Sequence, residues 1–383
     1  MTKGRKFVIV LSTFIGCTLL LSLLFNEKQK VEEIANIADL ENDNRGNTIS
    51  EPLGWPWKGV VISTHYDFDT DKDLTTLKNN GVNFVKIYLK PRKLAKSLDV
   101  SEEVGLELGL AQIDKILDKC KQLNLYAMIY FSEFPIGTDS EYTQNNKEFW
   151  EDSLLLRESK TKIKEVIHHF KNRGDELQAY QFIGEPVSLD KEGKATRPEE
   201  WDNFFLDIYS ILKSEDNYRY LLYTPGLWGG PQNYKDFEPL KDDSKIIYSF
   251  HYYAPHKYSH QGIGNELSFS YPGYINFAYW DKERIESSLQ AVIKFKEKFN
   301  RKILVGEFSA VYNAEGWENY LKDQLEIYTE KDFGYTYFTF NGWKGWALSD
   351  KNESAISHKN FGIFDMEERE KRLELLSEFW IKN

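Results

Sequence analysis

The sequence has little cysteine, with only Cys17 and Cys120 in 383 residues. Cys17 lies in an apolar segment near the N-terminus, and Cys120 lies on the predicted buried face of the helical pattern "AQIDKILDKCKQL". Two cysteines in such settings exclude a disulfide framework and a thiolate metal site. The chain therefore has to be stabilised by an apolar core, for which its 41% of apolar residues are sufficient.

The sequence also lacks an excess of positive charge. Lys and Arg number 49 against 60 Asp and Glu, so the formal net charge is −11 at pH 7. This balance disfavours nucleic-acid binding, which requires a basic face. The spacings His-x-His and His-Glu-x-x-His are missing as well. A metal-dependent hydrolase is therefore disfavoured, and we expect no metal and no other cofactor.

One long uncharged run stands out near the N-terminus. Phe7–Phe25 contains 19 residues without a charge and follows the basic stretch "MTKGRK". At about 1.5 Å per residue, such a helix can span roughly 30 Å of hydrocarbon. No small-x-small cleavage site follows closely, so we favour a signal anchor over a cleaved signal peptide for residues 1–25. Lipidation at Cys17 fits less well, because the apolar run continues past it.

The rest of the chain is predicted to lie outside the cytoplasm, because the basic end of such a segment stays inside. The protein is thus expected to be membrane-anchored through residues 7–25, or secreted. Residues 26–52 are polar and predict a tether, and residues 53–383 predict the folded domain.

Strand-like segments alternate with helical patterns through the folded domain. The eight strand candidates are Lys58–Thr64, Asn83–Leu89, Leu125–Phe131, Leu177–Ile183, Tyr218–Thr224, Ser244–His251, Lys302–Phe308 and Tyr335–Phe340. This alternation predicts an α/β fold, a (β/α)₈ barrel of the TIM type preceded by the N-terminal transmembrane helix. A doubly wound open sheet would also alternate, but no glycine-rich phosphate loop follows the first segment.

Two glutamates fall at the ends of predicted strands, Glu185 after the fourth and Glu307 in the seventh. In a (β/α)₈ barrel, catalytic residues lie where strands end, and strands four and seven can face each other across the mouth. Two carboxyl groups about 5 to 5.5 Å apart can perform retaining glycoside hydrolysis. Either glutamate alone is equally consistent with a surface position. With His251 and Tyr253 between them in sequence, the pair favours catalysis.

Further motifs accompany these residues, in the order "FIGEPV", "FHYYAP", "YSHQG" with "YPG" after it, "VGEFSAV" and "YTYFTFNGWKGWALSD". Their order and spacing, from about Trp55 to the end of the chain, resemble those of glycoside hydrolase family 5, whose members are retaining (β/α)₈ enzymes that act mostly on β-linked glycans. The first motif is similar to the family's Asn-Glu-Pro, the second to its His-x-Tyr, the fourth to its nucleophile motif and the last to its last-strand tryptophan region. The combination is specific, whereas a lone Gly-Glu-Phe would carry no weight.

The resemblance implies hydrolysis of O-glycosyl bonds by double displacement. Glu185 matches the acid/base and Glu307 the nucleophile. Tyr253 would contact the nucleophile carboxylate and help to keep it ionised, and His251 would orient the acid/base. The expected partner is an oligosaccharide or polysaccharide, and we expect a monomer.

Further sugar contacts are implied by position, each with a packing role as the alternative. Trp343 or Trp346 would stack under the sugar, and Trp343 is preferred because it lies nearer the strand end. His260 and Gln261 would reach the sugar or shape their loop. Trp228, after the fifth strand, would line a leaving-group site.

Three positions depart from the family pattern. Gly184 stands where the family has the Asn that precedes the acid/base, and Lys86 stands nearest to the family's Arg on the second strand. The third strand leads to Ser132 and Glu133 in place of a His. Two interpretations follow: an active β-glycosidase with an unusual glycan, or a catalytically weakened carbohydrate-binding protein on a glycosidase fold.

Overall fold

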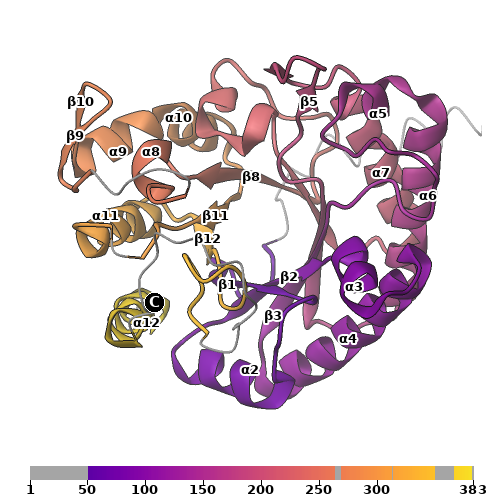
Figure 1. Cartoon of the computed structure of the whole chain (residues 1–383), viewed down its shortest axis with the longest axis horizontal. Coiled ribbons are helices and arrows are strands. Elements are labelled where there is room, and N and C mark those ends of the chain that lie inside the picture. The colour runs from indigo at the N-terminus through magenta and orange to yellow at the C-terminus, as the bar shows by residue number, and fades with distance from the viewer. Residues whose placement is uncertain (1–50, 264–268, 313, 350–365, 382–383) are drawn as a thin grey trace, which may run out of the picture. The chain divides into compact units, whose positions relative to one another are not determined.

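A computed structural model describes residues 51–263, 269–312, 314–349 and 366–381, all of which belong to the unit that begins at Glu51. Its centre is a closed barrel of eight parallel strands, in the ring order β1-β2-β3-β4-β7-β8-β11-β12 (Figure 1). The barrel strands are β1 (Lys58–Ser63), β2 (Phe84–Leu89), β3 (Tyr126–Phe131), β4 (Leu177–Phe182), β7 (Tyr220–Tyr223), β8 (Ile246–Tyr252), β11 (Ile303–Phe308) and β12 (Gly334–Tyr337). The predicted barrel is confirmed, and each of the eight predicted segments overlaps one of these strands.

Helices surround the barrel on its outside (Figure 1). They are α2 (Thr70–Asn79), α3 (Pro91–Leu98), α4 (Glu102–Leu123), α5 (Lys147–Glu151), α6 (Ser153–Phe170), α7 (Trp201–Glu215), α8 (His256–Ser259), α9 (Lys282–Ser288), α10 (Gln290–Phe299), α11 (Trp317–Glu330) and α12 (Met366–Ile381). Two short hairpins lie in the loops, β5 (Ser188–Leu189) with β6 (Ala195–Thr196), and β9 (Gly273–Ile275) with β10 (Ala278–Trp280). Two 3₁₀ turns, Leu227–Gly229 and Pro231–Tyr234, follow β7.

Helix α4 illustrates how local sequence sets these elements. Ser101 caps its N-terminus by accepting the Val104 backbone N–H, and Asn124 ends it in the left-handed conformation. Its buried residues recur at helical spacing and include Ile113, Leu117 and Cys120. Cys120 is fully buried, as its position in the pattern predicted.

The barrel interior is built in layers, because alternate strand residues point inward. In β2, Phe84 belongs to a lower apolar layer in which it stacks on Trp57 at 4.2 Å, and Tyr88 belongs to an upper layer with Val61 and Tyr130. The middle layer is polar, and its fully buried members include Lys86, Gln181, Ser249 and Thr336. Polar groups therefore lie directly beneath the upper mouth of the barrel.

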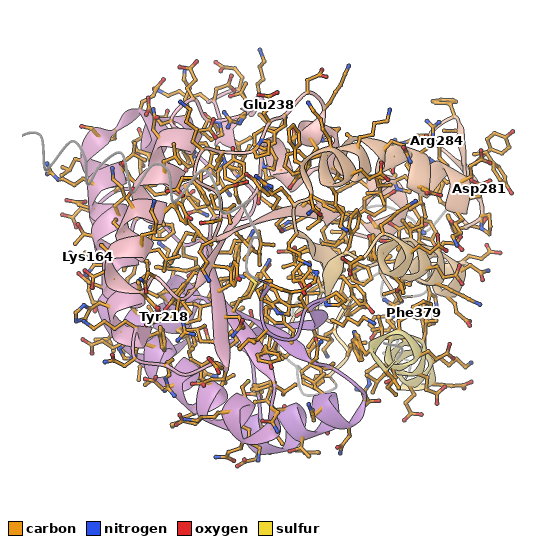
Figure 2. All side chains as sticks on the ribbon, turned by 180° about the vertical axis from the view of Figure 1, so that it is seen from behind. Lys164, Tyr218, Glu238, Asp281, Arg284 and Phe379 are labelled. Atoms are coloured by element: carbon orange, nitrogen blue, oxygen red, sulfur yellow. The ribbon has the colours of Figure 1, made fainter. Side chains whose placement is uncertain are left out.

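A larger apolar core fills the space between the strands and the helices. Phe379 of α12 is buried in it, whereas charged residues such as Lys164 and Glu238 are exposed at the periphery (Figure 2). This division between the inside and the outside of the unit is that of an ordinary water-exposed domain.

No helix in the described part of the chain is both long and apolar enough to cross a membrane. The predicted anchor, residues 7–25, lies outside the described residues, as does almost all of the predicted tether.

Candidate active site

Glu185 is directed into the barrel mouth by a sharp exit from β4. The last ladder bond of this strand runs from the Ile183 N–H to the Phe131 carbonyl at 3.2 Å, and Ile183 then adopts φ 61° while it is 2% exposed. A β-branched residue in this region costs on the order of 1–3 kcal/mol, and such strain concentrates at functional sites. The strained residue thus lies two positions before the predicted acid/base.

Glu307 reaches the mouth because of a bulge in β11. Leu304 faces the interior and Val305 the outer core, so strict alternation would turn position 307 outward. The pairing register shifts between Val305 and Glu307 against β8, and between Val305 and Phe308 against β12. The shift turns Glu307 inward and leaves Phe308 in the outer core.

Two tyrosine hydroxyls and one histidine connect the carboxylates. Tyr253 donates to Glu307 Oε2 at 3.0 Å, and Tyr88 donates to the other oxygen, Oε1. His251 Nδ1 lies 2.8 Å from Glu185 Oε1, while its Nε2 lies 3.8 Å from Glu307 Oε1. These contacts place His251 beside the predicted acid/base and Tyr253 on the predicted nucleophile.

The two carboxylates are close together but differ in exposure. One ligand atom each from Glu185, His251 and Glu307 lies within 4.8 Å of the other two. The Glu185 side chain is 38% exposed, and the Glu307 side chain is 11% exposed. These three groups are also near enough to hold a cation. Glu307 already accepts two phenolic hydrogen bonds and faces the ammonium of Lys86. Because these groups already satisfy the carboxylate, we assign no metal.

Burial and charge set the protonation of the site. Burial raises the pKa of Glu307 to about 7, and the positive charge of Lys86 opposes this rise. Lys86 is fully buried beneath the mouth, where its Nζ donates to the Gly306 carbonyl at 3.2 Å. Burial lowers the pKa of Lys86 to about 8, although Glu307 and then Glu185 favour its charged form. The lysine is therefore an electrostatic partner of the carboxylates and does not line the cavity.

His251 is neutral near pH 7, because burial lowers its pKa and the contact with Glu185 only partly offsets this effect. A neutral ring with its proton on Nδ1 donates to Glu185. Its Nε2 is buried and has no hydrogen-bond partner among the described residues. That nitrogen remains available as an acceptor for a hydroxyl group between the carboxylates.

Two cavities meet at the carboxylates. The smaller one, of about 230 Å³, is lined by residues from the ends of β2, β3 and β4, and the larger one, of about 670 Å³, by residues after β7, β8 and β12. Glu185, Glu307 and Phe338 line both. A linear glycan placed across the mouth would therefore pass between the two carboxylates.

The structure brings three of the predicted sugar contacts to the larger cavity, namely Trp228, His260 and Trp346. Trp228 is 43% exposed at the rim. Trp346 lies 5.9 Å from the Tyr253 ring and 4.9 Å from the His260 ring, and His260 has its pKa lowered to about 3 by burial and then by His256. These rings form one aromatic wall suited to the faces of sugars.

Two other predicted contacts lie away from the cavity lining. Trp343 packs edge-on against Trp346 at 5.0 Å. Trp346 lines the larger cavity and Trp343 does not, so Trp346 is the better placed of the two to stack under a sugar. Gln261 is 1% exposed, and its amide bonds both the N–H and the carbonyl of Phe269 at 3.0 Å. Of the two roles predicted for Gln261, these bonds fit the second, in which it shapes its own loop.

Gly184 is explained by its neighbour on β3. A Cβ atom at this position would lie 3.0 Å from Tyr130 Cε2, 3.2 Å from Gln181 Nε2 and 3.3 Å from His251 Cε1. The Gly184 N–H donates to the Tyr130 hydroxyl at 3.3 Å. The missing side chain therefore makes room for a tyrosine beside Glu185, the predicted acid/base.

Sequence reasoning missed the residues that dominate the smaller cavity. Tyr88, Lys90 and Tyr130 line it, and so do Ser132, Gln144, Asn145 and Ile183. Two of them, Tyr88 and Tyr130, could have been predicted. Tyr88 is two residues after Lys86 in β2 and so points into the barrel as well, and it pairs with Tyr130 of β3. Gln144 and Asn145 come from a loop and gave no such signal.

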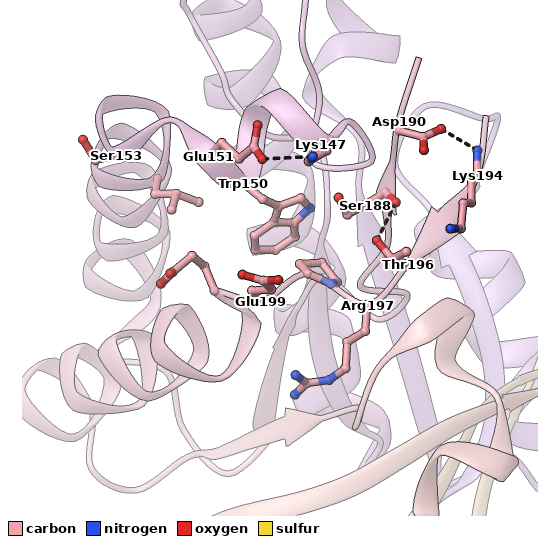
Figure 3. A pocket seen from close by; sticks show the side chains of 13 residues that line it. Lys147, Trp150, Glu151, Ser153, Ser188, Asp190, Lys194, Thr196, Arg197 and Glu199 are labelled. Atoms are coloured by element: carbon pink, nitrogen blue, oxygen red, sulfur yellow. Dashed lines mark hydrogen bonds and ion pairs between the residues drawn. The ribbon is translucent and has the colours of Figure 1, made fainter. Parts of the chain in front are cut away.

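A third cavity, of about 800 Å³, lies beside the β5–β6 hairpin and the start of α6 (Figure 3). Its lining includes neither Glu185 nor Glu307. Lys147 is paired there with Glu151 at 3.3 Å, and Arg197 is paired with Asp202 at 2.5 Å.

Comparison with known proteins agrees with this architecture. The profile of the family described as Cellulase (glycosyl hydrolase family 5) matches residues 43–344. Endoglucanase C of Acetivibrio thermocellus and endoglucanase C307 of Clostridium sp. are each 25% identical to this chain, over 73% of it and 87% of the relative.

Solved structures share the fold. A hyperthermophilic endo-beta-1,4-glucanase in complex with substrate superimposes with a TM-score of 0.61 at 18% identity, covering 82% of this chain and 96% of the other. Cel5A of Thermotoga maritima in complex with mannotriose gives a TM-score of 0.61 at 15% identity, covering 84% and 96%. The cellulose synthase subunit Z of Clostridioides difficile gives 0.59 at 16% identity, covering 88% and 97%.

Proposed function

The chain belongs to glycosyl hydrolase family 5, and from this premise we propose that it cleaves a β-linked glycan with retention of anomeric configuration, using Glu307 as nucleophile and Glu185 as acid/base. The observation that carries the proposal is the close approach of the two carboxylates, with one oxygen of each within 4.8 Å. Retaining enzymes need this short separation because the nucleophile attacks the sugar directly, whereas inverting enzymes leave room for a water molecule.

In the first step, a Glu307 oxygen attacks the anomeric carbon while Glu185 gives its proton to the departing glycosidic oxygen. The hydroxyl of Tyr253 and that of Tyr88 hold the attacking carboxylate in place. In the second step, Glu185 removes a proton from water, and the resulting nucleophile displaces Glu307 from the anomeric carbon. His251, bonded to Glu185 at 2.8 Å, fixes that carboxyl group for both steps.

The names of the relatives suggest the substrate. Both curated relatives are endoglucanases, so we propose that this protein cuts internal bonds of a β-linked glucan. The two cavities that meet at the carboxylates support internal cleavage, because sugar units can occupy both sides of the bond. The carbohydrate-binding alternative is less well supported, because both carboxylates retain their hydrogen-bonded partners.

The stereochemistry of the first product tests this mechanism. Proton NMR of hydroxyethylcellulose oligomers during hydrolysis by the full chain should show the β-anomer first, before mutarotation. Azide should also rescue Glu185→Ala and yield a β-glycosyl azide, since the glycosyl-enzyme on Glu307 would be intercepted. An α-anomer as the first product would contradict the proposal.

We also propose that residues 7–25 anchor a monomeric enzyme to the membrane, with its catalytic domain outside the cytoplasm. The support is the uncharged run of 19 residues behind a basic end. Membrane fractionation followed by protease treatment of intact cells should release the catalytic domain. Light scattering of the full chain in detergent should give the mass of one copy.

A further inference from the structure

The smaller catalytic cavity contains a lysine that the mechanism does not use. Lys90 follows β2 directly and lines this cavity together with Glu185 and Glu307. Its Nζ lies 5.1 Å from the centre of the Tyr88 ring and 5.8 Å from that of Tyr130. Among the described residues, no carboxylate forms an ion pair with it.

Three other titratable groups near Lys90 are either neutral or engaged with other partners. Glu133 is the carboxylate that most favours its charged form, but Glu133 is engaged with the Arg92 backbone N–H at 2.9 Å and does not line the cavity. His65 is neutral near pH 7, because burial and the nearby lysines lower its pKa to about 3. Lys86 lies below and is directed at Glu307 and Gly306.

Neutral donors lie on the same wall. Gln144 accepts the Phe134 N–H through its oxygen at 3.0 Å, so its NH₂ group is left as a donor. The side chain of Asn145, which lines the cavity, has no hydrogen-bond partner among the described residues. A cation with amide donors beside it is a donor set that binds a carboxylate.

The cavity of Figure 3 provides the contrast. Its lining carries four carboxylates, on Glu151, Asp190, Glu199 and Glu200, against three cations, on Lys147, Lys194 and Arg197. Two of those cations are already paired. Glu185 and Glu307 also line the smaller cavity, but His251, Tyr253 and Tyr88 already engage them. Lys90, in contrast, forms no ion pair with a described carboxylate, so of the two cavities the smaller one is the better candidate for an anion.

We propose that the smaller cavity recognises a carboxylate on the sugar unit that enters it, with Lys90 as the charged donor and Gln144 and Asn145 beside it. The substrate is then a β-glycan that contains a uronic acid or another acid-bearing sugar. This inference rests on the proposed function for its link to catalysis, but the binding it predicts can be measured without turnover.

The test is equilibrium binding of two matched disaccharides, cellobiose and cellobiouronic acid, to the full chain in detergent. The wild type should bind the acid on the order of tenfold more tightly, and rising ionic strength should reduce the difference. Lys90→Met should abolish the preference, while Lys90→Arg, which keeps the charge, should retain it. Lys93→Met removes an exposed charge one turn away and should leave the preference intact.

Equal affinities in the wild type, or an equal loss in Lys90→Met and Lys93→Met, would overturn the inference. Hydrolysis of hydroxyethylcellulose, measured separately, reports on the proposed function. Turnover without a preference for the acid would leave the enzyme assignment standing and remove this inference. A Lys90-dependent preference without turnover of any glycan would do the reverse.

Discussion

On one side of the barrel mouth, β8 supplies His251 and the loop after it supplies Tyr253, in the spacing that resembles the family. On the other side, β2 and β3 supply Tyr88 and Tyr130, where the sequence departs from that pattern. Both sides contact Glu307: Tyr253 donates to one of its oxygens, and Tyr88 donates to the other.

The departures on the second side compensate one another. Gly184 lacks a side chain, and Tyr130 occupies the space and accepts the Gly184 N–H. Lys86 keeps a positive charge beneath Glu307, and its Nζ also lies 4.5 Å from the Tyr130 ring centre. One side of the mouth therefore carries the residues that resemble the family pattern, and the other side carries the departures from it together with the tyrosines that accompany them.

The largest expected effect comes from the residue that both sides share. Glu307→Gln should lower kcat on hydroxyethylcellulose by about 10⁴-fold or more, because the nucleophile is lost while the cavity remains. Reducing-sugar release gives the rate. Glu318→Gln, on the exposed surface of α11, is the matched control and should keep the wild-type rate. If Glu307→Gln were as active as the wild type, Glu307 would not be the nucleophile.

The second prediction tests whether the two sides contribute equally. Tyr88→Phe and Tyr253→Phe each delete one hydrogen bond to a charged carboxylate, so each should lower kcat about 10- to 100-fold. Circular dichroism checks that the fold is retained. If Tyr253→Phe were impaired and Tyr88→Phe were silent, only the side that resembles the family would hold the nucleophile.

The strands and the two carboxylates could be predicted from the sequence because periodicity and strand-end position are local properties. Eight apolar segments separated by helical patterns favour a closed barrel, and the carboxyl ends of its parallel strands meet at one mouth. The contact of Tyr253 with Glu307 is implied by the family resemblance, and in the structure the two residues come from the neighbouring strands β8 and β11 or the loop after them.

The contact of Tyr88 with Glu307 could not be predicted in the same way. These residues lie 219 positions apart, on strands that are not neighbours in the ring, and they meet only across the closed barrel. The direction of Glu307 itself depends on a bulge that breaks strand alternation. The choice between Trp343 and Trp346 depends on the path of a loop, for which a residue pattern gives no periodicity.

The third prediction concerns the close packing of Gly184 against Tyr130, in which the small residue leaves space for the large one. Gly184→Ala places a methyl group 3.0 Å from the tyrosine ring, so it should destabilise the fold by about 1 to 3 kcal/mol. Denaturant titration measures this loss. The double variant with Tyr130→Ser should lose less than the sum of the single variants, since the shortened side chain makes room. Additive losses would show that the two positions are independent.

The smallest effect is expected in the pH profile, and it isolates the charge of Lys86. Glu307 has to be ionised to attack, and its pKa is raised to about 7, so kcat/KM should fall tenfold per pH unit below about 7. Lys86, with a pKa of about 8, stays charged across this limb. Removing its charge destabilises the carboxylate, so Lys86→Met should move the limb to higher pH by about one unit.

Activity above the shifted limb should change little, because Glu307 is ionised there in both proteins. Lys86→Arg keeps a positive charge at the same strand position and should leave the limb near that of the wild type. Lys93→Met, an exposed charge change on α3, should not move it. A limb that stays near pH 7 in Lys86→Met would mean that the two tyrosine hydroxyls alone stabilise the Glu307 carboxylate. Lys86 would then act mainly through its contacts with the rings of Tyr88 and Tyr130.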